Sequence, residues 1–477
     1  MRSKTLIALT VAAALLLGCG SRKADKAGGV TASAVLRIAA YKDDYYAKLF
    51  GDEVSRLSKG RLRVRYIPGH AAPPSTADAE VRVARTIVDG RYDLGVVPAR
   101  TWDELGVRSL EPLQAPFLIG GQSVFTAVLA SPVATRMLDG LRAQHVVGLG
   151  LIPGQLQHPL GYERPLARLA DFRGMRLHVP LSRVNDAVIT ALGAVPVHVG
   201  LTRVGPLVIR HALDGEEMPF YAPSHTWITA NLDLYADAST VVANAASYGR
   251  LSADQRRLLQ QAAAGAAATM RGYWAHDNDT RLAVKYCNSG HVVTAGDADR
   301  AELERAVAPV YAQLEQDPAI KATIAAIRDI GRRTAPDPAP VIPAGCPRAA
   351  TTTPIRGRER DPSFLDGTYR WRITRAGALK RGADPNDPVI EMVATMTLRG
   401  GGWAFELGSH DGGTFKVVGN RISFTDARRG TTDTFTFRRR ANGTLDLEPV
   451  LPMETGERTV MSSAPWVRVG APVRKVP

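Results

Sequence analysis

The stretch "VRVARTIVDGRYDLGVVP", residues 81–98, decides the fold class. Its first half repeats apolar residues at helical spacing, at Val81, Ala84 and Val88, and Gly90 then ends the helical pattern. "DLGVVP" follows at once, and its unbroken apolar character is typical of a strand that is buried on both faces of a parallel sheet. A helix that leads directly into such a strand indicates an α/β architecture.

The same alternation continues on both sides of this stretch. Strands are expected at "VLRIAAY" (35–41) and "RLRVRYI" (61–67), with an amphipathic helix between them. Further along, "HVVGLGLIPG" (145–154) opens a second unit, in which a helix over 184–192 leads into the strand "AVPVHV" (194–199). The sequence therefore predicts two α/β lobes.

The rest of the chain divides into a long helix and a separate β body. Residues 251–287 carry one long helical pattern, followed by a strand at "HVVTA" and two more helices to about residue 332. The Pro-rich stretch "TAPDPAPVIPAG" (334–345) cannot be helical and is typical of a linker. After Phe364, short strands alternate with turn signals such as Asn442-Gly443, which predicts a small antiparallel, lipocalin-like barrel.

These patterns predict the following division: a lipoprotein signal peptide at 1–18, a flexible tether at 19–34, a bilobal domain at 35–333, a Pro-rich linker at 334–363 and the β-barrel domain at 364–470. Within the bilobal domain, lobe 1 is expected at about 35–152 with parts of 235–333, and lobe 2 at about 153–234.

The N-terminus indicates export and lipidation. Arg2 and Lys4 precede an uncharged run that is too short to span a bilayer, as in a secretory signal. The run ends in "LLGC", which resembles the lipobox of bacterial lipoproteins, so Cys19 is the expected acylation site, although an ordinary signal cut elsewhere remains the alternative. Acyl chains on Cys19 would hold the protein on the outer face of the cell membrane.

Two cysteines remain after lipidation of Cys19, namely Cys287 and Cys346. In an oxidising compartment we expect them to form a disulfide, and two buried free thiols are the alternative.

The net charge of +14 does not by itself indicate nucleic acid. The arginines are scattered, often on the polar faces of alternating strands, so we interpret the charge as a surface property and expect no nucleic-acid partner.

The sequence contains no motif of a metal site, nucleophile or phosphate loop: His-Glu-x-x-His, Gly-x-Ser-x-Gly, Gly-x-x-x-x-Gly-Lys-Ser/Thr and Cys-x-x-Cys are all absent. "GLGLIPG" (148–154) has one residue too many for a dinucleotide fingerprint. We therefore expect neither an enzyme nor a bound cofactor or metal.

Several stretches in a shared order resemble one family, the solute receptors of tripartite ATP-independent periplasmic (TRAP) transporters. The resemblance covers about residues 35–330 and is carried by "DGRYDLGVV" (89–97), "LQAPFLI" (113–119), "RPLARLADFRGMRLHVP" (164–180), "ALGAVPV" (191–197), "LDGEEMP" (213–219) and "LSADQRRLLQQAA" (251–263). It implies that residues 35–333 form a bilobal solute-binding domain of the class II periplasmic-binding-protein type. The two lobes would close on an organic acid, which a membrane permease would then receive.

The resemblance also implies a ligand site, from which this sequence departs. His178 stands where such receptors usually carry an arginine that forks onto the ligand carboxylate, and a histidine cannot reproduce that planar, permanently charged donor. Glu217 matches the family pattern, whereas Met218 replaces an amide that usually contacts the ligand. If a carboxylate is still bound, Arg183 at the start of the following helix is the first candidate to supply the charge.

Other ligand contacts are expected beyond the strand ends of the two lobes. Tyr41, Arg100 and Trp102 follow strands of the first lobe, Gln155 and Gln157 occupy the corresponding loop of the second, and Trp227 follows the crossing segment. For each aromatic residue, packing is the alternative to binding.

The leading hypothesis is thus an extracytoplasmic, lipid-anchored receptor for a small organic solute, with no catalysis. The alternative is a sensor or interaction lipoprotein that uses the same lobes and docks a partner through the barrel. A third possibility is an apolar ligand inside the barrel.

Overall fold

The computed structural model describes residues 34–41, 45–66, 76–200, 203–204, 207–208, 210–220, 226–276, 279–287, 290–344, 346, 359–381, 392–406, 410–426, 432–450 and 460–469. The predicted signal peptide, the lipidation site at Cys19 and the tether up to residue 33 lie outside these residues.

The first lobe is built on five neighbouring strands in the order β2 (Leu62–Tyr66), β1 (Ala34–Ala40), β3 (Leu94–Pro98), β9 (Tyr235–Asn244) and β4 (Val146–Gly161). β1 pairs in parallel with β2 and β3, and β9 runs antiparallel between β3 and β4. The residues from "DLGVVP" form β3, and its Leu94, Val96 and Val97 are buried, as expected for a strand covered on both faces.

Two separate helix layers bury the two faces of this sheet, because successive strand residues point to opposite sides. Ile38 and Val96 pack against α1 (Tyr45–Ser58) and α9 (Ala253–His276). Their neighbours Ala39 and Val97 pack on the other side. That second layer contains α2 (Ala79–Val88), α3 (Gln122–Leu129), α4 (Pro132–Asp139) and the 3-10 turns η1 (Ala99–Leu105), η2 (Glu111–Gln114) and η3 (Gly140–Gln144).

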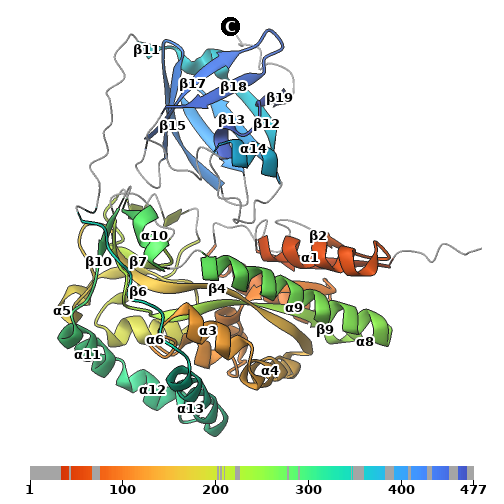
Figure 1. The fold of residues 1–477 in the computed structure, drawn as a ribbon, viewed down its shortest axis with the longest axis vertical. Helices are drawn as coiled ribbons and strands as arrows, with labels where there is room; N and C mark the ends of the chain where they lie inside the picture. Colours follow the sequence, from red (N-terminus) through yellow and green to blue (C-terminus); the bar gives the residue numbers. More distant parts are fainter. Residues whose placement is uncertain are drawn as a thin grey trace, which may run out of the picture.

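The second lobe continues the same sheet. β4 pairs antiparallel with β7 (Gly215–Met218) and β8 (Trp227–Thr229), β5 (Arg176–His178) pairs in parallel with β7 and β6 (Val195–Val197), and β10 (His291–Val293) pairs with β8. The helices of this region are α5 (Leu169–Phe172), α6 (Arg183–Ala191), α10 (Asp279–Tyr286), α11 (Asp297–Ala306) and α12 (Ala308–Leu314), while α8 (Ala245–Gly249) follows β9 at the far end of the first lobe (Figure 1).

One strand therefore links the two lobes. β4 pairs with β9 up to Gln157 and with β7 and β8 from His158 onward, and the register of its pairing with β9 shifts between Pro153 and Leu156. The expected strand at 145–154 is thus too short, and Gln155 and Gln157 lie within β4 and not in a loop. A bulge increases the local twist of a strand, which lets β4 continue from one lobe into the next.

The expected helix over 251–287 is found as α9 and α10, with residues 277–278 outside the described part. Three helices follow the strand β10, where the sequence pattern indicated two, because α12 is short and α13 (Pro318–Arg333) begins anew at Asp317. The Asp317 carboxylate accepts bonds from the backbone N–H groups of Ala319 and Ile320, which caps α13.

The Pro-rich segment after α13 runs along both lobes. The Asp337 carboxylate accepts a 2.8 Å bond from the backbone N–H of Ser123, at the start of α3, and a bond from the Ser123 hydroxyl. The backbone N–H of Val341 then donates to the Thr280 hydroxyl of α10 at 3.2 Å. Cys346 forms a disulfide with Cys287, the pairing expected from the sequence.

The C-terminal body is an antiparallel barrel. Its strands follow the order β18 (Leu445–Pro449), β17 (Thr432–Arg439), β16 (Arg421–Asp426), β15 (His410–Val418), β14 (Gly402–Glu406), β13 (Met392–Arg399), β12 (Gly367–Ile373) and β19 (Val467–Val469), and β11 (Glu359–Arg360) pairs with β15. Two backbone hydrogen bonds between Leu445 and Trp466, of 2.9 and 2.8 Å, join the start of β18 to the residue just before β19, so the two ends of this strand order meet.

The barrel interior is filled by its own side chains. Trp371 and Trp466 stack with ring centroids 4.3 Å apart, and Tyr369, Phe424 and Phe435 are buried beside them. A short helix, α14 (Arg375–Lys380), and a 3-10 turn, η4 (Pro362–Leu365), also belong to this body, although the sequence showed no helical pattern there. Figure 1 shows the barrel as a separate body beside the bilobal one.

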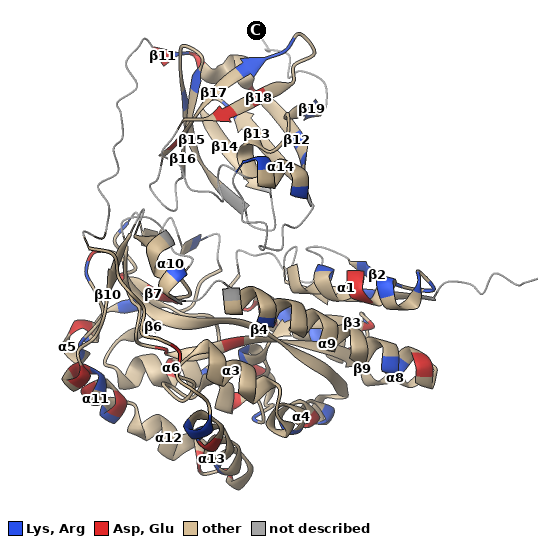
Figure 2. Cartoon of the chain, in the orientation of Figure 1, with Lys and Arg blue, Asp and Glu red and all other residues tan. Residues whose placement is uncertain are grey.

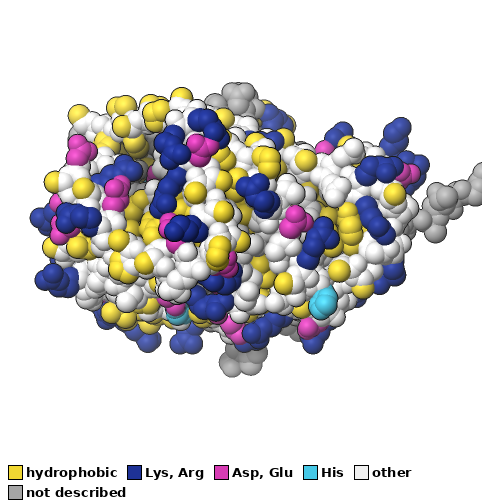
Figure 3. Space-filling model, turned by 90° about the horizontal axis from the view of Figure 1, so that it is seen from below, with side chains coloured by type: hydrophobic (Ala, Val, Ile, Leu, Met, Phe, Trp, Pro, Cys, Tyr) yellow, Lys and Arg dark blue, Asp and Glu magenta, His cyan; other side chains and the backbone are white. Residues whose placement is uncertain are grey.

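Charged side chains of both signs are interspersed over the structure. Figure 2 shows Lys and Arg next to Asp and Glu along the helices of the bilobal body, and Figure 3 shows the same mixture on the face seen from below. This distribution agrees with a solvated surface. In the described part of the chain, no single helix is long and apolar enough to cross a membrane, and one bent pair, 122–129 with 132–144, passes that test by length and composition only.

Candidate functional site

A buried arginine lies between the first lobe and the crossing strands. Arg100 follows β3 directly and is 7% exposed. Its Nη2 donates to both carboxylate oxygens of Glu80 on α2, at 2.8 Å each, and its Nη1 donates to Oδ1 of Asp237 on β9 at 3.2 Å. The two terminal nitrogens of the guanidinium thus serve two different carboxylates. Arg100 is therefore held rigidly by two carboxylates.

A buried carboxyl group from the second lobe lies close to this arginine. Glu217 on β7 is 6% exposed, and its Oε1 accepts bonds from Asn185 Nδ2 on α6 at 2.9 Å and from the Tyr235 hydroxyl on β9 at 3.0 Å. Burial raises the pKa of Glu217 to about 8, and these two bonds and the Arg100 charge oppose the shift only in part. Glu217 is thus largely protonated at pH 7.

We call the six residues Glu80, Arg100, Asn185, Glu217, Tyr235 and Asp237 the interlobe cluster. Its members come from α2, η1 and β9 of the first lobe and from α6 and β7 of the second. Within the cluster, two atoms, Arg100 Nε and Asn185 Oδ1, are buried without a hydrogen-bond partner in the described part of the chain. Buried polar atoms are normally bonded, so each of these two atoms can take a further partner.

A second contact joins the lobes beside this cluster. The Ser182 hydroxyl lies 2.6 Å from Asp103 Oδ2, and the backbone N–H of Val184 donates to the same oxygen at 3.3 Å. The Arg183 guanidinium in turn donates to the Asp103 carbonyl. Burial raises the pKa of Asp103 to about 6, against the bonds from Ser182 and Val184. Asp103 on η1 thus holds the start of α6 across the lobe junction.

His178 does not face an open cleft. It is buried, its Nε2 lies 3.2 Å from the Val199 carbonyl, and its Nδ1 lies 3.4 Å from Glu216 Oε2. Both ring nitrogens therefore face protein oxygens. The structure places His178 within the second lobe and does not bring it into the interlobe cluster, so its expected position is corrected.

The two tryptophans differ in their surroundings. Trp102 is completely buried in the core of the first lobe, where its indole N–H donates to the Thr240 hydroxyl at 2.9 Å. Trp227 stacks on His291, with ring centroids 3.8 Å apart and an interplanar angle of 6°. The Trp102 ring therefore belongs to the core, whereas the partly buried Trp227 ring has one face packed on His291.

Of the remaining expected ligand contacts, Tyr41 lies near the interlobe cluster, whereas Met218 packs elsewhere and the two glutamines lie in a strand. Tyr41 is half-buried and lies near the cluster, since the charges of Glu80 and Arg100 both act on its hydroxyl, whose pKa is raised mainly by burial. Met218 packs against an apolar cluster of the second lobe, away from Glu217, because neighbouring strand residues point to opposite faces. Gln155 and Gln157 lie within the crossing strand β4.

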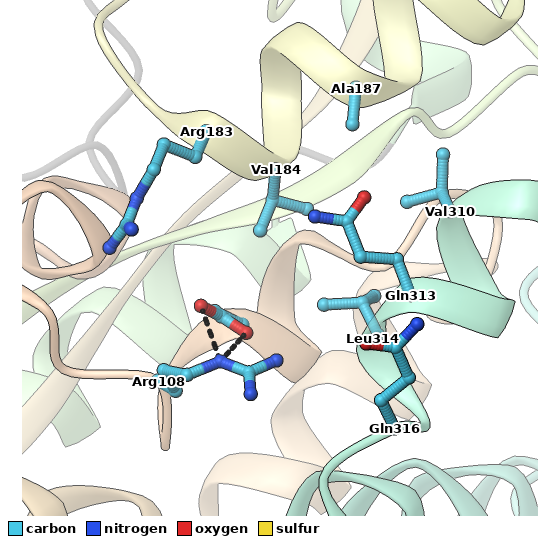
Figure 4. A pocket seen from close by; sticks show the side chains of 9 residues that line it. Arg108, Arg183, Val184, Ala187, Val310, Gln313, Leu314 and Gln316 are labelled. Atoms are coloured by element: carbon cyan, nitrogen blue, oxygen red, sulfur yellow. Dashed lines mark hydrogen bonds and ion pairs between the residues drawn. The ribbon is translucent and has the colours of Figure 1, made fainter.

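Arg183 lines a cavity of about 220 Å³. Figure 4 shows Arg183 and Arg108 on one side of it and Gln313 and Gln316 on the other. Arg108 is paired with Glu111 at 3.2 Å and lies 3.6 Å from Asp317. The cavity is thus bounded by α6, by the segment around η2 and by α12, next to the lobe junction.

Sequence reasoning missed most of the cluster: Glu80, Asn185, Tyr235 and Asp237 were not among the expected site residues. Asn185 had a weak signal, because it follows Arg183 in the first turn of a helix at the lobe junction. In the described part of the chain, no group of three or more His, Cys, Asp or Glu side chains is placed to hold a metal ion.

Residues 42–317 match the family model described as "Bacterial extracellular solute-binding protein, family 7". The match covers more than half of the chain, so the chain belongs to this family, and the resemblance seen in the sequence is confirmed. A relative, the C4-dicarboxylate-binding periplasmic protein DctP of Rhodobacter capsulatus, is 25% identical over 236 residues, which are 47% of this chain and 69% of the relative. The uncharacterized protein YiiZ of Salmonella typhimurium is 23% identical over 305 residues, which are 60% of this chain and 88% of that one.

Solved structures show the same fold. A TRAP periplasmic solute-binding protein of Ralstonia eutropha with bound (S)-2-acetolactate gives a TM-score of 0.55 at 19% identity, and 63% of this chain covers 99% of it. The sugar-acid-binding protein DctPAm of Advenella mimigardefordensis, in complex with galactonate, also gives 0.55, at 21% identity, with 63% and 98% covered. The predicted bilobal fold is confirmed, and the chain is an extracytoplasmic solute-binding protein of the TRAP type.

Proposed function

We propose that this protein is a lipid-anchored receptor that captures a small carboxylate-bearing solute between its lobes and delivers it to a membrane permease. The interlobe cluster carries the proposal, because the buried Arg100 of one lobe lies near the buried Glu217 of the other. Arg100 has an unpartnered Nε, and Asn185, which is bonded to Glu217, has an unpartnered Oδ1. A solute at this place would touch both lobes. It would then favour closure through contacts that the open state lacks.

Relatives support the class of solute. One relative is named as a C4-dicarboxylate-binding protein, and solved structures of similar proteins contain succinate or galactonate. In this chain, Arg100 Nε is a buried N–H donor that a carboxylate oxygen could accept from, and Arg183 supplies a further positive charge beside the lobe junction. Tyr41 borders the same region. Anchoring through Cys19 rests on the "LLGC" sequence, and no catalytic step belongs to the proposal.

A binding screen tests this function. The purified full-length protein is dialysed and then titrated with monocarboxylates, dicarboxylates, amino acids and sugar acids, and thermal unfolding and titration calorimetry are recorded. A true ligand at 100 times its dissociation constant stabilises the folded protein by about 2.7 kcal/mol. A flat response across the whole panel would argue against the receptor, and a protein mass without the acyl chains would argue against the anchor.

A sensor or docking role is a second candidate, favoured by one observation. The family match ends at residue 317, so the whole barrel lies outside it. Its interior is filled by Trp371, Trp466 and their neighbours, which argues against a ligand inside and leaves its outer surface for a partner. Recovery of a signalling protein instead of a permease after crosslinking in cells would favour this candidate.

A further inference from the structure

The interlobe cluster has more acceptors than donors. It contains three carboxyl groups, from Glu80, Glu217 and Asp237, but a single cationic group, the Arg100 guanidinium. Both terminal nitrogens of Arg100 are already bonded to Glu80 and Asp237. A solute with carboxylates alone would bring further negative charge to the cluster, where the one cationic group, Arg100, is already paired. Burial of a negative charge without a free cationic partner is costly.

The unpartnered atoms are of two kinds. Arg100 Nε is a donor and needs an acceptor from the solute, whereas Asn185 Oδ1 is an acceptor and needs a donor. The amide of Asn185 is oriented by its bond to Glu217, since its Nδ2 donates to Glu217 Oε1. Asn185 is 1% exposed and Arg100 is 7% exposed, so water reaches both poorly.

Glu217 supplies a second acceptor, besides Asn185 Oδ1, for a donor group of the solute. Its bonds from Asn185 and Tyr235 both end on Oε1, so Oε2 receives neither of them and is the oxygen that we assign to a solute donor. The partners of Oε1 are uncharged, so no full positive charge is bonded directly to this carboxyl group. A group with several N–H donors and a positive charge would satisfy Asn185 Oδ1 and Glu217 Oε2 together.

We propose that the solute of this receptor carries an ammonium group as well as a carboxylate, that Asn185 and Glu217 bind the ammonium, and that Arg100 Nε binds the carboxylate. The inference rests on the proposed receptor function and specifies its solute class as amino-bearing organic acids. The groups that face Glu217 are Tyr235 and Asp237 from β9, Arg100 from η1 and Asn185 from α6. Since burial holds Glu217 protonated near pH 7, an arriving ammonium displaces the carboxyl proton, which is released to solvent.

Matched solutes test the inference. The full-length protein is titrated with sets that share one skeleton and differ only in one substituent: succinate, malate and aspartate; glutarate, 2-hydroxyglutarate and glutamate; propionate, lactate and alanine; and galactonate with its 2-amino-2-deoxy analogue. We expect the amino member of the best-binding set to bind at least tenfold more tightly than its hydroxyl and unsubstituted partners. Tighter binding of the unsubstituted or hydroxyl acid would overturn the inference and leave the receptor function standing. If no member of any set binds, the receptor function itself fails, and this inference fails with it.

A measurement of proton release tests whether the ammonium group of the solute contacts Glu217 directly. Calorimetry at pH 7 in two buffers of different ionisation enthalpy should show release of about one proton per bound solute. Glu217→Gln keeps the shape of the side chain and should abolish the release and weaken the amino solute at least tenfold. Glu302→Gln, at an exposed position of α11, is the matched control and should change neither quantity. Unchanged proton release in Glu217→Gln would overturn the assignment of Glu217.

Discussion

Replacement of Arg100 by methionine tests how the lobe junction is held together. Methionine keeps most of the apolar stem but removes the guanidinium, so Glu80 and Asp237 lose their shared partner. Breaking a buried ion pair on one side costs about 3–5 kcal/mol. The side chains of Glu80 and Asp237 are 19% and 30% exposed, so some solvation is regained. We therefore expect a loss at the lower end, about 3 kcal/mol at pH 7.

The loss should shrink in acid. Burial already raises the pKa of Asp237, and removal of the guanidinium raises it further. A carboxyl group whose folded-state pKa lies above its unfolded value is harmless below the unfolded pKa and costs stability as the pH rises through the folded pKa. The difference between the Arg100→Met variant and the parent protein should therefore be smaller at pH 5 than at pH 7.

A chain with several bodies need not unfold in one step, so the loss of stability in Arg100→Met has to be measured within the first lobe. Hydrogen exchange of its backbone amides provides this measurement. Amides of β3 and β9 should exchange about 150-fold faster in the variant at pH 7, which corresponds to about 3 kcal/mol. Arg91→Met, at an exposed arginine just after α2, is the control and should stay within about 0.5 kcal/mol. A loss below about 1 kcal/mol, or one that grows in acid, would refute the reasoning.

Three further perturbations give separate tests. The double variant Cys287→Ser/Cys346→Ser opens a loop of 59 residues, so the free energy of unfolding should fall by about 4 kcal/mol by the loop-entropy relation. Denaturant unfolding measures this loss, and a parent protein that is equally stable with and without reductant would contradict it. Asp103→Asn should flatten the pH dependence of stability between pH 5 and 7, because the raised pKa of about 6 makes the parent protein lose stability as the pH rises through that value; an unchanged profile would count against the contact. Trp466→Ala should destabilise the barrel by about 3–5 kcal/mol and leave the lobe transition in place, whereas exposed Val467→Ala should do little; a shift of the lobe transition would show that the two bodies unfold together.

The sequence was sufficient for the architecture, because periodicity reports local burial. The helical spacing in α2 and the continuous apolar run in β3 both reflect which faces are covered, and covered faces define an α/β lobe. It was insufficient for β4, whose continuation past Pro153 depends on pairing with β7 and β9 and on a register shift that leaves no local pattern.

The site was predictable only where topology alone places a residue. Arg100 was expected near the ligand because it follows a strand end, and it does lie at the lobe junction. Its partners Glu80 and Asp237 are 20 and 137 residues away, and no sequence pattern connects them. The same rule was wrong for Trp102, since η1 turns its ring back onto the sheet, where it meets Thr240, 138 residues away. Rules about strand ends place a residue near a cleft but do not say which way its side chain points.

Native mass spectrometry tests the central claim most directly. The full-length protein is purified from its own host in detergent, without dialysis, and sprayed under non-denaturing conditions. We expect a retained small molecule that is present in the Glu302→Gln control and is lost from Glu217→Gln and Arg100→Met. A parent protein that never carries such a molecule, or one that keeps it in both cluster variants, would contradict capture of a solute at the interlobe cluster.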